Sequence, residues 1–332
     1  MMGARVELAH GGGGTMTAEL IDLVREYVGN PLLDQLEDAA RLETGSRTAF
    51  TTDSFVVSPL EFPGGDIGRL AVAGTVNDLA VMGARPTYLS LALIIEEGLA
   101  FDELRRLLAS VRDTADEAGV TVACGDTKVV EHGKADGLFI TTSGVGEIPD
   151  GVDVSVRNAR PGDAVIVSGE IGLHGVAVMA ARKSLGFASS AESDVAPLNH
   201  LIAPVVERCD VHAMRDPTRG GCAAALHEIA DASDVTIVLD EDALPVPDVV
   251  AGACSILGTD PLATPNEGKV LVLLPEGEAG GALFRLRGHA YGRSAAIIGR
   301  AEPRGRFPVT LRTALGERLV DAPRGELLPR IC

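Results

Sequence analysis

The chain has 332 residues, of which 46% are hydrophobic and only 3% aromatic, and it contains no tryptophan. This length and composition predict two domains with aliphatic cores. The formal net charge is −18, from 29 basic and 47 acidic residues, whereas a nucleic-acid-binding domain carries a basic surface, so we exclude a nucleic-acid partner. No secretory segment opens the chain and no apolar run approaches transmembrane length, so we also expect no membrane partner.

The predicted elements begin with a glycine-rich segment that precedes a helix. His10 is followed by four glycines, Gly11, Gly12, Gly13 and Gly14. Backbone N–H groups of such a loop can bind phosphate groups at the start of a helix. The segment lacks the Lys-Ser/Thr ending of a P-loop and the third glycine of a dinucleotide fingerprint. A phosphate-binding loop and an irregular N-terminal segment therefore both stay open.

The next strand and helix each contain an acidic residue in apolar surroundings. A strand is predicted over 49–57 with Asp53 inside it, and Asp66 is a predicted N-cap of the following helix. Within that helix, Asn77 and Asp78 lie among small apolar residues. An unpaired buried carboxylate is costly, so Asp78 should meet a cation or a metal ion, although an exposed polar helix face is the alternative.

A third acid follows later in the first domain. A strand over 120–123 is predicted to end just before Cys124, and Asp126 and Lys128 follow it next to Gly125. An acid and a lysine just past a strand end are typical of a binding site. Cys124 itself is predicted to be a small core residue rather than a nucleophile. The other elements predicted here are a strand over 88–95, a helix over 101–118 and a strand over 138–143.

A domain joint is predicted over 156–162, and a second domain follows. Asp216, Arg219 and Gly220 precede a helix that runs to about residue 232, an arrangement that favours anions. Asn266 and Glu267 precede a strand over 270–274. The remaining predicted elements are helices over 174–185, 197–209 and 281–289, and strands over 164–168, 235–239, 294–299 and 308–313. The pattern favours two α+β or α/β domains without deciding between them.

The chain ends in a cysteine on a segment that is predicted to be extended. From Asp321 onwards it contains two prolines, and proline and its preceding residue favour extended backbone. The eleven residues after Asp321 reach roughly 35 Å, enough to carry the thiol of Cys332 into a cleft. A chance cysteine and an intermolecular disulfide are alternatives, but a prenylation site is not, since its cysteine stands fourth from the end.

The five cysteines of the chain are odd in number and have no zinc-binding spacing. Disulfides form in oxidising compartments. We therefore expect reduced thiols and a cytoplasmic protein.

Taken together, these segments resemble the HypE family of hydrogenase maturation proteins. This family belongs to an ATP-binding superfamily that includes aminoimidazole ribonucleotide synthetase, thiamine-phosphate kinase and selenophosphate synthetase. No single segment is specific, but their order and spacing are, and the terminal Pro-Arg-Ile-Cys is the mark of the HypE family itself. The matching segments are 9–14, 52–54, 62–65, 77–78, 125–128, 216–221, 266–269 and 329–332.

The resemblance implies an α+β protein of two domains whose N-terminal sheet forms a barrel across a homodimer. The expected boundaries are 1–155 for an ATP-binding domain, 156–320 for a second domain and 321–332 for a flexible tail. ATP is expected between the two domains. A carbamoyltransferase, HypF, would load a carbamoyl group onto Cys332. The protein would then dehydrate this S-carboxamide to a thiocyanate at the expense of ATP, and the cyano group would pass to iron on a HypC–HypD scaffold for [NiFe]-hydrogenase.

The resemblance also assigns residues to this chemistry. Asp53, Asp78 and Asp216 match the metal-binding acids of the superfamily, and oxygen ligands suit Mg²⁺. Glu267 is the favoured base, with Lys128 and His10 as alternatives. The residues expected to contact ATP are Gly11, Gly12, Gly13, Gly14, Asn77, Asp126, Arg219, Gly220 and Asn266. Two other functions stay open, a small-molecule kinase or synthetase of the same superfamily and a carrier without chemistry.

Overall fold

The computed structural model describes residues 14, 15, 18, 40–43, 47–182, 189–323, 325, 328 and 330–332. The predicted loop residues His10, Gly11, Gly12 and Gly13 lie outside the described part of the chain.

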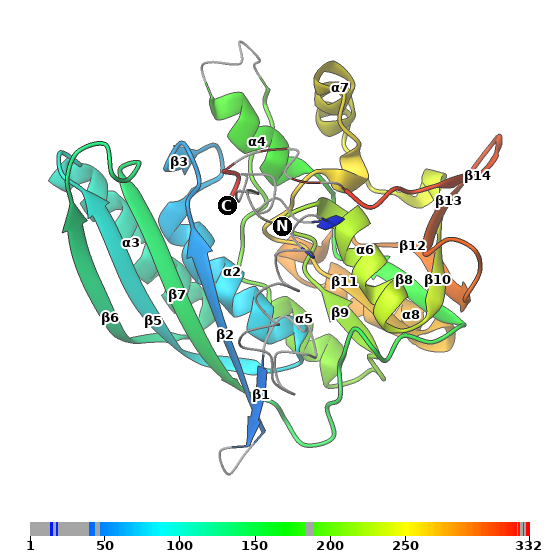
Figure 1. The fold of residues 1–332 in the computed structure, drawn as a ribbon. Helices are drawn as coiled ribbons and strands as arrows, with labels where there is room; N and C mark the ends of the chain where they lie inside the picture. Colours follow the sequence, from blue (N-terminus) through cyan, green and yellow to red (C-terminus); the bar gives the residue numbers. More distant parts are fainter. Residues whose placement is uncertain are drawn as a thin grey trace, which may run out of the picture.

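The first domain is a five-stranded sheet with two helices on one face (Figure 1). The strand order is β1-β2-β7-β5-β6, in which β5 and β6 run parallel and the other neighbours antiparallel. Asp66 caps the helix Ile67–Val81 as predicted, because its carboxylate accepts from the backbone N–H groups of Gly68 and Arg69. The elements are β1 (Ala40–Glu43), β2 (Arg47–Phe55), β3 (Glu61–Phe62), β4 (Gly65–Asp66), α2 (Ile67–Val81), β5 (Arg85–Glu96), α3 (Phe101–Ala118), β6 (Thr121–Val130) and β7 (Leu138–Glu147).

The second domain is a seven-stranded mixed sheet with helices on both faces. Its strand order is β14-β13-β10-β12-β8-β11-β9. The strands are β8 (Asp163–Val167), β9 (Ala213–Arg215), β10 (Val235–Asp240), β11 (Leu271–Pro275), β12 (Ala296–Pro303), β13 (Val309–Thr313) and β14 (Gly316–Leu319). The helices are α4 (Leu173–Ala181), α5 (Asn199–Val206), α6 (Gly221–Ala232), α7 (Asp248–Leu257) and α8 (Glu276–Arg287), with short 3₁₀ turns at Glu241–Ala243, Pro261–Ala263 and Ala290–Gly292.

The alternation of side chains along β8 explains why this sheet is covered on both sides. Val165 and Val167 pack into the core under α6, whereas Ala164 and Ile166 pack into the core under α5 and α8. Every residue of β8 is buried, as expected for a strand between two layers of helices.

The two domains share buried cores along α2. Ala80 and Val81 at the end of α2 belong to the core under α5 and α8. Val178 and Met179 of α4 belong to the core of the first domain. Side chains of both domains therefore pack together in two shared cores.

The structure confirms the α+β class and corrects two local predictions. The strand predicted over 120–123 continues to Val130, so Asp126 and Lys128 lie within β6 and not after it. Cys124 is exposed and not a core residue, because β6 is an edge strand whose side chains from Thr121 to Val129 are all exposed. Among the described residues, no helix combines the length and apolarity needed to cross a membrane.

Candidate active site at the C-terminal cysteine

The last three residues dock against the end of β2, at the junction of the two domains (Figure 1). The backbone N–H of Val56 donates to the backbone oxygen of Cys332, and the backbone N–H of Ser58 donates to the carbonyl oxygen of Arg330, each at 3.2 Å. These two contacts have the i and i+2 spacing of an antiparallel strand pair. These contacts hold the tail alongside the residues that follow β2 and bring Cys332 into the molecule.

Two side chains of the second domain, His174 and Arg182, hold the tail in this position. His174 on α4 lies 2.8 Å from the carbonyl oxygen of Ile331 through Nε2 and 2.8 Å from Oγ of Ser193 through Nδ1. A carbonyl oxygen can only accept, so Nε2 of His174 donates, and burial lowers the pKa of His174, which favours the neutral ring. Arg182 donates to the carbonyl oxygens of Arg330 (2.7 Å) and Ser58 (2.8 Å).

The two side chains before the cysteine anchor the tail in different ways. Ile331 is 2% exposed and packs into the core of the first domain. Arg330 forms an ion pair with Asp136 and has a left-handed backbone conformation, with φ 54°. That conformation costs an L-residue about 1 kcal/mol or more, so the surrounding contacts must offset it.

The first domain contributes two carboxylates from neighbouring elements. Thr51 and Asp53 lie on the face of β2 that points towards α2, since side chains alternate along a strand. Oγ1 of Thr51 donates to Oδ2 of Asp78 on α2 at 2.7 Å. Burial raises the pKa of Asp53, and the nearby Arg219 opposes this increase. Asp53 and Asp78 are thus brought to the same side of the sheet, next to the tail.

The second domain contributes two buried carboxylates. Burial, together with the charges of Asp53 and Glu228, raises the pKa of Asp216 to about 6, although Arg215 opposes the increase. Burial, together with the charges of Asp216 and Asp53, holds the pKa of Glu267 well above its usual range. Oε1 of Glu267 has no hydrogen-bond partner among the described residues. Acids of both domains therefore lie close enough to influence one another, and burial together with these charges favours the protonated form of Glu267.

Arg219 supplies the positive charge in this cluster. Negative charge at Cys332 is the largest contribution that raises its pKa, followed among the acids by Asp53, Glu267 and Asp78. The chain turns into α6 directly after it, through Gly220 and Gly221, with φ 76° and 61°. A Cβ atom at Gly221 would lie 2.5 Å from a backbone oxygen of Leu262, so a larger residue would not fit there.

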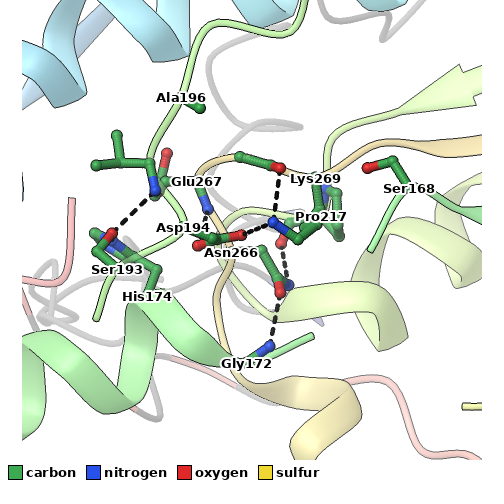
Figure 2. Close-up of polar contacts among 12 residues, drawn as sticks. Ser168, Gly172, His174, Ser193, Asp194, Ala196, Pro217, Asn266, Glu267 and Lys269 are labelled. Carbon is green, nitrogen blue, oxygen red and sulfur yellow. Dashed lines mark hydrogen bonds and ion pairs between the residues drawn. The ribbon is translucent and has the colours of Figure 1, made fainter. Parts of the chain in front are cut away.

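A network of buried side chains fixes the backbone around Glu267 (Figure 2). Oδ1 of Asn266 accepts from the backbone N–H of Gly172 at 2.7 Å, and Nδ2 of Asn266 donates to the carbonyl oxygen of Pro217 at 3.0 Å. Oδ1 of Asp194 accepts from the backbone N–H of Glu267 at 3.2 Å, and Asp194 also forms a buried ion pair with Lys269 at 3.0 Å.

Asn77 joins the same network from the first domain. Its Nδ2 donates to the carbonyl oxygens of Ala196 (3.1 Å) and Glu267 (3.4 Å), and its Oδ1 accepts from the N–H of Leu198 (2.8 Å). The family resemblance implies that the side-chain amides of Asn77 and Asn266 contact ATP, but in this structure both amides are hydrogen-bonded to backbone groups. Here they position Asp78 and Glu267, their neighbours in the sequence.

Two predicted site residues lie elsewhere within the described protomer. Asp126 and Lys128 are on β6, which β5 and β7 separate from β2. The structure thus brings together Cys332, Arg219, Glu267 and the three metal-binding candidates, but not these two. It also adds Lys269, which ends the matching segment 266–269, and five residues that belong to no motif of the sequence analysis, His174, Arg182, Ser193, Asp194 and Thr51.

The acid cluster fits a cation, although it does not form a complete metal site by itself. No group of three His, Cys, Asp or Glu side chains lies close enough to hold a metal ion within the described part of the chain. Asp53 nevertheless raises the pKa of Asp216, both acids raise the pKa of Glu267, and an oxygen of Glu267 is unpartnered among the described residues. A divalent cation that arrives with phosphate ligands would relieve this repulsion, because oxygen ligands suit Mg²⁺.

Comparison with known families assigns both domains. Residues 36–148 match the N-terminal domain of AIR synthase related proteins, and residues 160–312 match the C-terminal domain of the same family. A thiamine monophosphate kinase from Aquifex aeolicus shares the fold, with a TM-score of 0.63 at 20% identity over 88% of this chain and 96% of that one.

Much closer relatives cover the whole chain. Carbamoyl dehydratase HypE of Rhodobacter capsulatus is 51% identical, over 99% of this chain and 98% of the relative, and its Escherichia coli K12 counterpart is 43% identical, over 98% and 99%. A crystal structure of a HypE–HypF complex superposes with a TM-score of 0.88 at 46% identity, covering 92% of this chain and 100% of the other. A HypE structure in complex with ATP gives 0.83 at 46% identity, over 99% and 100%. The chain therefore belongs to the HypE family of carbamoyl dehydratases, ATP-binding enzymes of hydrogenase maturation built on the AIR synthase related fold.

Proposed function

We propose that this chain dehydrates the S-carboxamide carried on its own Cys332 to a thiocyanate, at the expense of ATP. The observation that supports this proposal most directly is the docked tail, which holds Cys332 beside Arg219 and between acids of both domains. A carrier without chemistry would not need such a cluster. A small-molecule kinase of the superfamily would not need its C-terminal thiol inside the cleft.

The proposed reaction activates the carboxamide oxygen and then eliminates it. The oxygen attacks the γ-phosphorus of ATP, which forms a C–O–P link and releases ADP, and one nitrogen proton is lost. A base then takes the second nitrogen proton, the C–O bond breaks, and inorganic phosphate leaves as the C≡N bond forms. Phosphoryl transfer depends mostly on positioning and charge stabilisation, which suits a site rich in fixed charges.

Four groups of this chain have proposed roles in that sequence. Glu267 is the proposed base. Its raised pKa makes it a stronger base once ionised, and Arg219 lies close enough to favour ionisation. Asp53, Asp78 and Asp216 are the proposed ligands of Mg²⁺, which would supply positive charge next to the phosphates when bound.

The proposed partners follow from the family and from the open face of the first domain. Since a relative has been crystallised as a HypE–HypF complex, we propose that HypF loads the carbamoyl group onto Cys332 and that the cyano group passes to iron on HypC–HypD. We also propose a homodimer in which the exposed edge strand β6 pairs with a second copy. Asp126 and Lys128, which lie apart from the cleft of their own protomer, would then face the partner subunit and its nucleotide.

Intact mass spectrometry tests this function directly. The protein is incubated with HypF, carbamoyl phosphate and ATP, and the mass of the chain is followed over time. We expect the gain of one carbamoyl group, then the loss of one water only when this protein can turn over ATP.

Substitution of a proposed metal ligand separates the two steps. Asp78→Ala should still be carbamoylated by HypF but should not lose water. Asp113→Ala removes an exposed carboxylate on α3 and serves as the matched control, with dehydration at the wild-type rate. Equal dehydration by the Asp78 variant would refute the assigned role of Asp78.

A further inference from the structure

His174 on α4 connects the docked tail with a segment of the second domain that lies next to Glu267. Its side chain is fully buried, and each ring nitrogen has a partner at 2.8 Å, the carbonyl oxygen of Ile331 at Nε2 and Oγ of Ser193 at Nδ1. The proposed reaction gives a role to neither His174 nor Ser193.

The direction of these hydrogen bonds follows from the outer partners. The backbone N–H of Val195 donates to Oγ of Ser193 at 3.1 Å, which leaves the hydroxyl hydrogen of Ser193 to donate in turn. The carbonyl oxygen of Ile331 can only accept, so Nε2 of His174 carries the proton and Nδ1 accepts from Ser193. Burial lowers the pKa of His174, which favours this neutral ring. A single directed chain of hydrogen bonds thus runs from the backbone of Val195 to the backbone of the tail, and bonds in such a chain strengthen one another.

The same short segment, residues 193–196, holds the backbone of Glu267 (Figure 2). Oδ1 of Asp194 accepts from the backbone N–H of Glu267 at 3.2 Å. The backbone N–H of Ala196 donates to the carbonyl oxygen of Glu267 at 3.4 Å. Both backbone polar groups of the proposed base are therefore bonded to residues that directly follow Ser193.

Close packing prevents this segment from moving independently of its neighbours. A Cβ atom at Gly268 would lie 1.7 Å from the backbone oxygen of Asp194, and one at Gly64 would lie 2.6 Å from the backbone nitrogen of Ser193. The backbone N–H of Ser193 also donates to the carbonyl oxygen of Pro63 at 2.8 Å. Backbones that approach one another so closely have to shift together.

We propose that His174 is a positioning residue for the dehydration: together with Ser193 it ties the docked tail to the segment that holds Glu267, so that the S-carboxamide and its proposed base are fixed relative to each other. This inference rests on the proposed function, because it names the residue that connects the two reacting groups. A misplacement of about 1 Å can slow a reaction on the order of 100-fold, so the loss of such a link should be visible in the rate.

The first measurement follows docking of the tail without any chemistry on it. The alkylation rate of Cys332 is measured by mass spectrometry with peptide mapping, in the free protein without ATP or HypF. Among the described residues, Ser193 has no hydrogen bond to the tail. Ser193→Ala should nevertheless raise the alkylation rate roughly 10-fold, because it removes the bond that orients His174. Ser193→Thr keeps the hydroxyl group and should restore the wild-type rate.

The chain offers matched controls for this measurement. Oγ of Ser189 also accepts from a backbone N–H two residues later, that of Ala191 at 3.1 Å, so Ser189→Ala removes a similar bond and should react like the wild type. The buried Cys222 and Cys254 report on the fold in the same digest and should stay unreactive in every variant.

A double substitution shows whether the two residues act as one unit. His174→Ala should raise the alkylation rate of Cys332 by itself. Ser193→Ala should then add little in the His174→Ala background, because the link is already broken.

The second measurement is a single turnover of dehydration. HypF first loads the carbamoyl group onto Cys332, and the loss of water is followed after ATP is added. Since the link also holds Glu267, Ser193→Ala should slow this step by a larger factor than the one by which it raises alkylation, and Ser193→Thr should restore it. A decrease no larger than the increase in alkylation would overturn the connection to Glu267.

Equal alkylation of Cys332 in the wild type and in Ser193→Ala would overturn the inference, and so would fully additive effects of Ser193→Ala and His174→Ala. Failure of the wild type to dehydrate its carbamoylated cysteine would instead defeat the proposed function. The alkylation rates, which are measured without ATP, would still decide whether His174 and Ser193 fix the tail.

Discussion

At the scale of single residues, the most unusual feature is a set of carboxylates that are held at high pKa. Asp216 has a pKa of about 6 compared with 3.8 for a free side chain, because it is buried and faces other acids. The folded state therefore binds a proton more tightly than the unfolded state between these two pH values. This tighter proton binding adds to the free energy of unfolding fully below pH 3.8. The added free energy is lost as the pH rises through 6, and the total loss is about 3 kcal/mol.

Asp216→Asn should remove this pH dependence. We expect the variant to have an unfolding free energy close to that of the wild type near pH 4 and to be more stable by up to about 3 kcal/mol above pH 7. Urea unfolding from pH 4 to pH 8 measures the difference, with Asp102→Asn on the exposed face of α3 as the control. Parallel stability curves for the variant and the wild type would contradict this account. The same substitution should block dehydration, so stability and activity change in opposite directions.

Glu267→Gln tests the proposed base without disturbing the packing. Burial and the neighbouring acids raise the pKa of Glu267 well above its usual range, which favours the neutral form, so the neutral glutamine side chain of the same shape is a close substitute. We expect the variant to fold with a midpoint near that of the wild type, to accept a carbamoyl group from HypF and to lose no water. The mass assay measures the product and thermal unfolding measures the fold. Dehydration at an undiminished rate would assign the base elsewhere.

At the scale of elements, one asparagine on α2 connects the two domains at the site. Asn77 bonds to the backbone at Ala196, Leu198 and Glu267, all in the second domain, while its neighbour Asp78 belongs to the acid cluster. The distance between Asp78 and Glu267 is thus set by one side chain and by the helix that carries it.

Asn77→Ala should loosen this connection. Three buried backbone groups would lose a partner, at a cost of about 1–3 kcal/mol for each unsatisfied group that cannot reach water. We expect a lower unfolding free energy and a slower dehydration step, with carbamoylation by HypF unchanged. Asn158→Ala is the matched control, because Asn158 also donates to a backbone oxygen, that of Asp153, but lies outside the site. A loss of stability with full dehydration activity would leave Asn77 a purely structural residue.

The sequence predicts those elements whose signals are local and misses those that depend on distant contacts. The start of α2 follows from Asp66, whose carboxylate caps the helix within three residues. The apolar neighbours of Asp78 likewise predict a partner, and Oγ1 of Thr51 donates to its carboxylate. No local signal marks His174, whose contact with Ile331 spans 157 residues. The predicted strand over 120–123 ends too early, because a glycine such as Gly125 often marks the end of a strand, whereas β6 continues to Val130.

At the scale of the whole molecule, the first domain exposes the edge strand β6 and apolar side chains on one sheet face, within the part of the chain that the structure describes. Val122 and Val129 on β6 are 39% and 69% exposed, and Tyr88 on β5 is 56% exposed. An open edge strand presents unpaired backbone groups that a second copy can bind. The proposed dimer would cover this edge and would place Asp126 and Lys128 in the interface.

Charges on β6 should therefore separate the subunits. The double substitution Val122→Glu and Val129→Glu places like charges opposite each other in the proposed strand pairing, which is destabilising. We expect light scattering to give the mass of a dimer for the wild type and of a monomer for the variant. Ile256→Glu on α7, where the isoleucine is 73% exposed, adds the same charge far from β6 and should leave the dimer intact. If Asp126 and Lys128 act on the nucleotide of the partner subunit, the monomeric variant should also fail to dehydrate Cys332, whereas a monomer with full activity would confine the whole site to one chain.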